Sequence, residues 1–147
     1  MKISIYKYEE LGVDKLYEIL KLRSEVFVVE QNCPYQDLDN KDKKAIHVIG
    51  EENNKIIAYT RIFKKGDFFK NSSIGRVLVK KKYRKKEYGK KIMVKSIEKI
   101  KQNPKEEKIE LSAQKYLTKF YKDLGFEKKG KEYLEDNIPH IKMILKI

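Results

Sequence analysis

The chain has 147 residues, with 35 lysines or arginines against 22 aspartates or glutamates, and a formal net charge of +13. This length fits one domain, residues 1–147, with a single core, and the hydrophobic content of 40% excludes a disordered chain. There is no membrane-length apolar run and no signal-peptide pattern, and Cys33 has no internal disulfide partner, so we expect a cytoplasmic protein without a membrane partner.

The spacing of apolar residues predicts strands and helices along the whole chain. In chain order the patterns predict strand 2–8, helix 14–27, strands 45–50, 55–63 and 73–79, helix 88–102, strand 109–112, helix 117–124, and strands 126–131 and 141–147. Residues 29–40 are expected to form a loop or a short irregular helix. This order indicates an α/β sheet of mixed strand direction with helices on both faces.

Turn and cap residues mark where several of these elements end. Asp14 is expected to cap the first helix. Asn53 and Asn54 predict a two-residue hairpin turn, because asparagine tolerates positive φ. Residues 103–104, an Asn-Pro pair, stop the second helix, and Gly125 stops the third.

The segment from residue 76 to residue 92 is the most informative for function. A short apolar strand leads into a basic turn and then into a helix with one apolar face. The first amides of a helix lack internal partners, and the helix dipole favours negative charge there. The turn adds the basic side chains Arg84, Lys85, Lys86, Lys90 and Lys91. The sequence therefore predicts a site for a phosphate or pyrophosphate.

The positive charge alone does not indicate a nucleic-acid partner. Only four basic residues are arginine: Arg23, Arg61, Arg76 and Arg84. Arginine is the residue whose planar guanidinium forms paired hydrogen bonds to phosphates and to base edges in the DNA grooves. The lysines are spread over almost every segment, whereas nucleic-acid binding uses a clustered basic face. We therefore expect the charge to attract small anions, and a basic nucleic-acid-binding module is the least favoured alternative.

Several blocks, together with the order of elements, resemble the GNAT superfamily of acyl-CoA-dependent N-acetyltransferases, and more narrowly its ElaA-like branch. These blocks are residues 22–35, 37–39, 111–114, 124–126, 132–136 and 138–140. The resemblance implies one acyltransferase domain with a mixed, mostly antiparallel sheet of six to seven strands flanked by about four helices. It also implies acetyl-CoA as co-substrate, a small-molecule or peptide amine as acceptor, no metal, and a monomer or homodimer.

The resemblance also assigns the phosphate site to acetyl-CoA. It implies that the backbone of Val77, Leu78 and Val79 contacts the pantetheine arm and the thioester carbonyl. The pyrophosphate would lie on the loop formed by Arg84, Lys85, Lys86, Glu87, Tyr88, Gly89 and Lys90. Glu87 stands where the family pattern has glycine, which permits unusual φ and close approach of phosphate. We expect weakened but retained binding, and a catalytically weak acyl-CoA-binding protein of the same fold is the leading alternative.

Candidate catalytic and acceptor residues follow from the same resemblance. Tyr121 stands where the family often has the acid that protonates the CoA thiolate, although its spacing also fits a plain apolar stripe. Candidates for accepting the proton of the amine are Glu110 and His140, with Glu30 and His47 as further possibilities. The residues expected to line the acceptor pocket are Glu30, Gln31, Tyr35, His47, Arg61 and Gln114. The carboxylates Glu30, Asp37 and Asp39 give a weak indication of a cationic acceptor.

Overall fold

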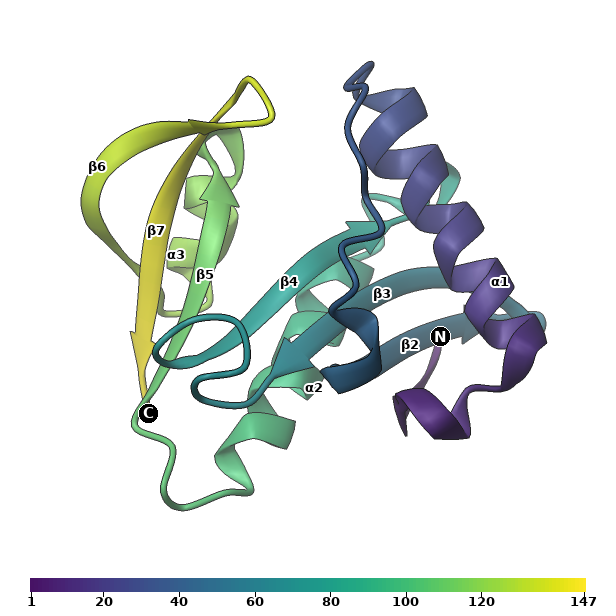
Figure 1. Cartoon of the computed structure of the whole chain (residues 1–147), viewed down its shortest axis with the longest axis horizontal. Coiled ribbons are helices and arrows are strands. Elements are labelled where there is room, and N and C mark those ends of the chain that lie inside the picture. The colour runs from purple at the N-terminus through teal and green to yellow at the C-terminus, as the bar shows by residue number, and fades with distance from the viewer.

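Seven strands form one twisted sheet in the computed structural model, which describes all 147 residues (Figure 1). The strands are β1 (Lys2–Lys7), β2 (Ile46–Glu52), β3 (Lys55–Phe63), β4 (Ser72–Val79), β5 (Lys108–Gln114), β6 (Glu127–Glu135) and β7 (Ile138–Lys146). Their order in the sheet is β1-β2-β3-β4-β5-β7-β6, and every neighbouring pair is antiparallel except β4–β5. The predicted mixed, mostly antiparallel sheet is therefore confirmed.

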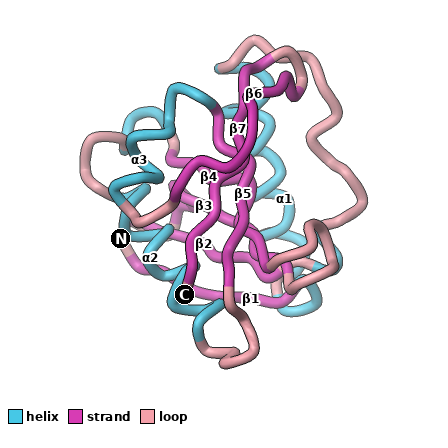
Figure 2. Tube along the Cα trace, turned by 90° about the vertical axis from the view of Figure 1, so that its left-hand side faces the viewer, coloured by secondary structure: helices cyan, strands magenta, loops and turns pink.

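The helices cover both faces of this sheet, as the views in Figures 1 and 2 show. They are α1 (Gly12–Arg23), α2 (Tyr88–Lys101) and α3 (Thr118–Asp123), and α1 continues into a π-helical segment, Ser24–Glu30. The apolar stripe predicted for α2 is buried against the larger core, whereas α1 packs against a smaller core on the other face. None of these helices has both the length and the apolar content to cross a membrane.

The strands β4 and β5 touch at one end only, and this divergence creates the space for a site. Their parallel pairing is confined to Ser72–Ile109 and Ser73–Glu110, after which the two strands separate (Figure 1). A bulge in the β3–β4 pairing adds to the bend of β4, and Arg76 within it has a φ of 50°. The second half of β4 therefore has a free backbone edge.

Two predicted boundaries are wrong. Asp14 does not cap α1, because a 3-10 turn, Tyr8–Glu10, runs directly into the helix and leaves Asp14 inside its first turn. The last two strands are longer than predicted and form a hairpin. Its turn residues Asp136 and Asn137 have φ of 50° and 62°, much like the correctly predicted turn at Asn53 and Asn54 with 53° and 61°.

A closed ring of alternating arginines and aspartates fixes the segment between α1 and β2 onto the sheet. Its consecutive pairs are Arg23–Asp37 at 2.8 Å, Asp37–Arg76 at 2.7 Å, Arg76–Asp39 at 3.6 Å, Asp39–Arg61 at 2.5 Å, Arg61–Asp42 at 2.9 Å and Asp42–Arg23 at 2.7 Å. The side chains of Arg23 and Arg61 are 0% and 1% exposed, so each needs its carboxylate partners. We call these six residues the arginine–aspartate ring.

The ring makes stability depend on pH in the acid range. Burial alone would raise the pKa of Asp39, but hydrogen bonds and charge from Arg61 outweigh it and lower the pKa from 3.8 to about 2. A carboxyl group whose pKa is lower in the folded protein than in the unfolded chain stabilises the fold at every pH above its unfolded pKa. That contribution disappears as the pH falls from about 4 to about 2.

Replacing Asp39 with asparagine is expected to lower the free energy of unfolding by about 2 kcal/mol at pH 7. The difference from the wild type should shrink as the pH is lowered from 4 to 2, because Asp39 then loses its charge in both states. Urea unfolding at each pH measures this difference. Asp67→Asn is the control, because Asp67 forms no ion pair. A difference that stayed constant with pH would contradict this role for Asp39.

Candidate functional site

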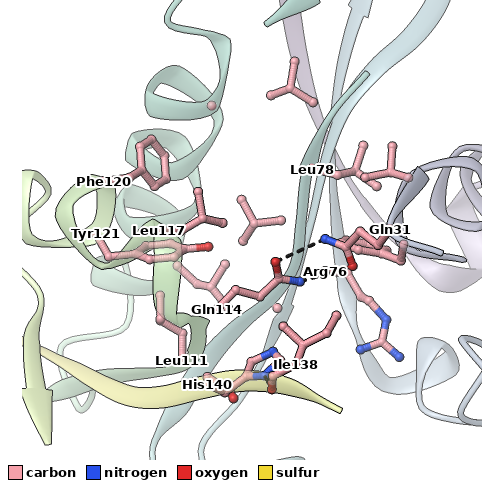
Figure 3. A pocket seen from close by; sticks show the side chains of 18 of the residues that line it. Gln31, Arg76, Leu78, Leu111, Gln114, Leu117, Phe120, Tyr121, Ile138 and His140 are labelled. Atoms are coloured by element: carbon pink, nitrogen blue, oxygen red, sulfur yellow. Dashed lines mark hydrogen bonds between the residues drawn. The ribbon is translucent and has the colours of Figure 1, made fainter. Parts of the chain in front are cut away.

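A cavity of about 1100 Å³ opens where β4 and β5 diverge. Its walls come from β4, β5, β7, the π-helical segment, the start of α2, and the helix α3 with its preceding turn. Figure 3 shows Leu78 and Arg76 on one wall, with Leu111, Leu117 and Tyr121 facing them from the other. The cavity thus lies along the free edge of β4, where backbone groups are open to a ligand.

The basic turn forms one end of this cavity. Lys85 and Glu87 both have left-handed backbone conformations, with φ of 67° and 60°, and α2 begins directly after them. The first amide of the helix with a backbone acceptor is that of Lys91, which donates to the Glu87 carbonyl at 3.0 Å. The preceding amides of residues 88–90 therefore point out of the helix end, as an anion site requires.

Gly89 lies at this helix end and faces the cavity. A Cβ built there would meet Phe120 Cζ at 3.5 Å and Val79 Cγ2 at 3.7 Å, which are ordinary contacts with two cavity-lining side chains. Protein packing alone therefore does not require glycine. The open space beside the backbone suits a ligand that approaches it closely.

Most of the predicted loop residues line the cavity, but Arg84 is not free to bind an anion. Its Nε donates to the Val79 carbonyl, and its two terminal nitrogens bind Glu30 at 2.6 and 2.9 Å. Arg84 therefore ties the turn to the π-helical segment. Lys86 does not line the cavity, and its ammonium lies 5.5 Å from the centre of the Tyr83 ring.

Tyr121 is buried in the wall of the cavity and presents its hydroxyl there (Figure 3). The hydroxyl has no hydrogen-bond partner within the protein, whereas the ring packs in the larger core. Burial raises the pKa of this phenol above its usual value, so it keeps its proton at neutral pH. Tyr121 therefore belongs to the apolar stripe and also lines the cavity, and its role as the acid stays a prediction.

His140 on β7 lies in the opposite half of the cavity and is held by three neighbours. Its Nδ1 lies 2.6 Å from the Ile138 carbonyl, and its Nε2 lies 3.1 Å from Glu135 Oε2. The ring of Tyr133 stacks on it with centroids 6.2 Å apart. The Ile138 carbonyl at Nδ1 and the Glu135 carboxylate at Nε2 both accept hydrogen bonds, so both contacts suit a donating N–H of the ring.

Gln31 and Gln114 join the two walls of the cavity. Each amide donates to the other, at 3.1 and 3.3 Å, so that the end of the π-helical segment is linked to the end of β5 (Figure 3). Tyr35 also lines the cavity, and its hydroxyl donates to Asp37 at 2.9 Å. These three predicted acceptor residues are therefore brought together.

Three predicted site residues do not line this cavity. His47 is fully buried between Tyr59 and the Asp42 carbonyl, and burial lowers its pKa. Arg61 belongs to the arginine–aspartate ring. Glu110 lies at the closed end of the β4–β5 pair, where it meets Asn71 and Lys142. Position along a predicted strand does not reveal which part of the sheet stays open.

The three carboxylates that gave a weak indication of a cationic acceptor are all paired within the protein. Glu30 is paired with Arg84, and both Asp37 and Asp39 are paired within the ring. Glu135 and Arg76 also line the cavity, although no site role was predicted for either of them. A charged residue inside the apolar strand 74–79 was the available signal for Arg76, and the short hairpin turn was the signal for Glu135.

Comparisons with known proteins agree with this geometry. The family model described as an acetyltransferase (GNAT) domain matches residues 5–147. Protein ElaA of Escherichia coli K12 is 41% identical over 138 residues, covering 92% of this chain and 90% of ElaA. A UPF0039 protein of Schizosaccharomyces pombe is 40% identical over 146 residues, covering 97% and 96% of the two chains.

Solved structures show the same similarity in three dimensions. The crystal structure of Escherichia coli ElaA has a TM-score of 0.91 and 38% identity, with 99% of each chain covered. An acyl-CoA N-acyltransferase from Pseudomonas aeruginosa has a TM-score of 0.91, 32% identity and the same coverage. An aminoglycoside 6'-N-acetyltransferase complexed with coenzyme A shares the fold, with a TM-score of 0.75, 13% identity, and 99% and 97% coverage.

Proposed function

The chain belongs to the GNAT acetyltransferase family of acyl-CoA-dependent N-acyltransferases, and we propose that it transfers acetyl from acetyl-CoA to a primary amine by direct attack in a ternary complex. The observation that carries this proposal is the cavity between β4 and β5. It combines a free strand edge, an open helix end and a protonated phenol in one space. Each feature has a use in acyl transfer from a CoA thioester: the strand edge can pair with the pantetheine amides, the helix end can bind the pyrophosphate, and the phenol can protonate the departing sulfur.

The donor half of the cavity suits acetyl-CoA. The pyrophosphate would lie on the amides at the start of α2, with Lys85 and Lys90 nearby. The pantetheine amides would pair with the free edge of β4 along residues 77–79, as an added strand would. An amide of that edge would also polarise the thioester carbonyl and stabilise the negative charge that develops on its oxygen.

The acceptor half supplies the proton transfers. The C–N bond forms as the amine attacks the thioester carbonyl, and the C–S bond breaks to release CoA. One proton must leave the nitrogen, and one must reach the departing sulfur. We assign the first to the His140–Glu135 pair, in which the half-exposed Glu135 carboxylate is the acceptor, and the second to the Tyr121 hydroxyl.

Acetyl-CoA titration by calorimetry, followed by thiol release with a panel of primary amines, tests the proposal. Saturable binding together with amine-dependent thiol release is the expected result. Binding without thiol release for any amine would favour the alternative, a catalytically weak acyl-CoA-binding protein, which Glu87 at the phosphate end supports. No binding at millimolar acetyl-CoA would contradict both functions.

Replacing Glu87 with glycine is expected to tighten acetyl-CoA binding and to stabilise the fold by about 1 kcal/mol. The change removes a negative charge beside the pyrophosphate, and glycine adopts the left-handed conformation at φ 60° without a steric penalty. Calorimetry and urea unfolding measure the two effects. Glu87→Gln is the matched control, because it removes the charge but keeps the strained backbone, so only its affinity should improve. Unchanged affinity in both variants would show that the carboxylate does not oppose CoA.

Replacing Tyr121 with phenylalanine is expected to slow turnover by about 100-fold, since a positioned acid contributes at least that much. Acetyl-CoA affinity and stability should change little, because the hydroxyl has no partner in the protein. Steady-state thiol release and calorimetry separate the two effects. Tyr116→Phe changes a second, exposed cavity tyrosine and should leave turnover intact. Equal turnover in the wild type and Tyr121→Phe would assign the acid to another group or to water.

A further inference from the structure

Resting on the proposed acetyl transfer, we propose that the acceptor is an amino acid-like zwitterion, whose amine is acetylated and whose carboxylate is bound by Arg76 and Lys41. These two cations line the acceptor half of the cavity. Two groups remain available there once the internal ion pairs are assigned: Nη1 of Arg76, whose charge is shared with Asp37 and Asp39, and the ammonium of Lys41.

Arg76 lines the cavity and has one terminal nitrogen that the protein does not use. Its Nε donates to Asp37 Oδ1 at 2.7 Å, and its Nη2 donates to the Asp37 carbonyl at 2.8 Å. Its Nη1 has no hydrogen-bond partner and is not sealed off from solvent, and the side chain is 21% exposed. A guanidinium that is already held in place loses little entropy when it binds a carboxylate.

Lys41 adds a second cation without a carboxylate partner. Its ammonium lies 5.5 Å from the centre of the Phe68 ring, and it belongs to none of the ion pairs of the chain. Phe68 lines the cavity as well. A carboxylate that enters here would meet the unused Nη1 of Arg76, the unpaired ammonium of Lys41 and the Phe68 ring, beside Asp39, whose charge is held by Arg61 and Arg76.

The opposite wall carries acidic side chains. Glu135 and Asp136 line the cavity at the β6–β7 turn, next to His140. Figure 3 shows His140 and Arg76 on opposite sides of the half of the cavity that is away from Phe120. A zwitterion fits this polarity with its ammonium toward the proposed base and its carboxylate toward Arg76, whereas a simple diamine would place a cation against Arg76 and Lys41.

The place of Arg76 on β4 limits the distance between the two ends of the acceptor. Arg76 precedes Leu78, on the proposed thioester track, by two residues and lies within the β3–β4 bulge, so the backbone between them spans at most about 7 Å. An acceptor whose amine and carboxylate are separated by a short methylene chain suits this short separation.

Matched amine pairs test the proposal through thiol release with acetyl-CoA. The probes are β-alanine against propylamine, 4-aminobutyrate against butylamine, and 6-aminohexanoate against hexylamine. We expect kcat/KM to be at least tenfold higher for the carboxylated member of one or more pairs. Equal or higher kcat/KM for every plain amine would overturn this inference while leaving acetyl transfer in place.

Two variants locate the carboxylate site. Lys41→Gln should lower kcat/KM several-fold for the preferred carboxylated acceptor and leave its plain amine unchanged, because Lys41 has no structural partner to lose. Lys43→Gln in the same segment is the control, since Lys43 does not line this cavity. Arg76→Lys should act in the same direction and more strongly, with acetyl-CoA affinity as the check on folding. Equal effects of Lys41→Gln on both members of a pair would overturn the assignment.

Calorimetry keeps this test independent of turnover. With the protein saturated with CoA, 4-aminobutyrate should bind more tightly than butylamine, and Lys41→Gln should remove the difference. If no amine releases thiol, acetyl transfer fails as the function, and this binding comparison still decides whether the carboxylate site exists. Tighter binding of butylamine would overturn the site.

Discussion

The separation of β4 from β5 is the constraint on which the site depends. Two adjacent parallel strands normally pair along their length, but here pairing ends after Ser73, and the bulge at Arg76 bends β4 further away. The same divergence exposes backbone groups of β4, opens the cavity and sets Tyr121 opposite that edge. The proposed donor track, reaction space and proton donor thus all depend on one interruption of the sheet.

The two halves of the cavity are formed by different kinds of group. The proposed donor half is formed mainly by backbone groups, namely the edge of β4 and the amides at the start of α2, and requires few side chains. The acceptor half uses side chains held by buried charge, because the segment that forms its roof has little regular structure and is fixed by the arginine–aspartate ring. This division explains why a short turn motif is enough to indicate the donor site, whereas acceptor residues come from distant parts of the chain.

The sequence was most informative where local chemistry alone determines structure. The apolar stripe of α2, the Asn53-Asn54 turn and the basic strand-loop-helix each depend on neighbouring residues, and the structure agrees with them. The positions of His47 and Glu110 outside the cavity could not be predicted, because spacing along one chain does not reveal where the sheet opens or closes. The bulge at Arg76 and the approach of Glu135 to His140 depend on strand register, which spacing in one chain does not determine.

The arginine–aspartate ring also limits which amino-acid substitutions this protein can accept during evolution. Every member forms ion pairs with two residues of opposite charge, so replacing any one of them leaves its neighbours with one ion-pair partner fewer. Substitutions within the ring would have to arrive in compensating pairs, through intermediates of low stability. Changes in acceptor preference are therefore easier to reach through cavity residues outside the ring, such as Gln36, Lys41 and Phe68, than through the charges that hold the roof in place.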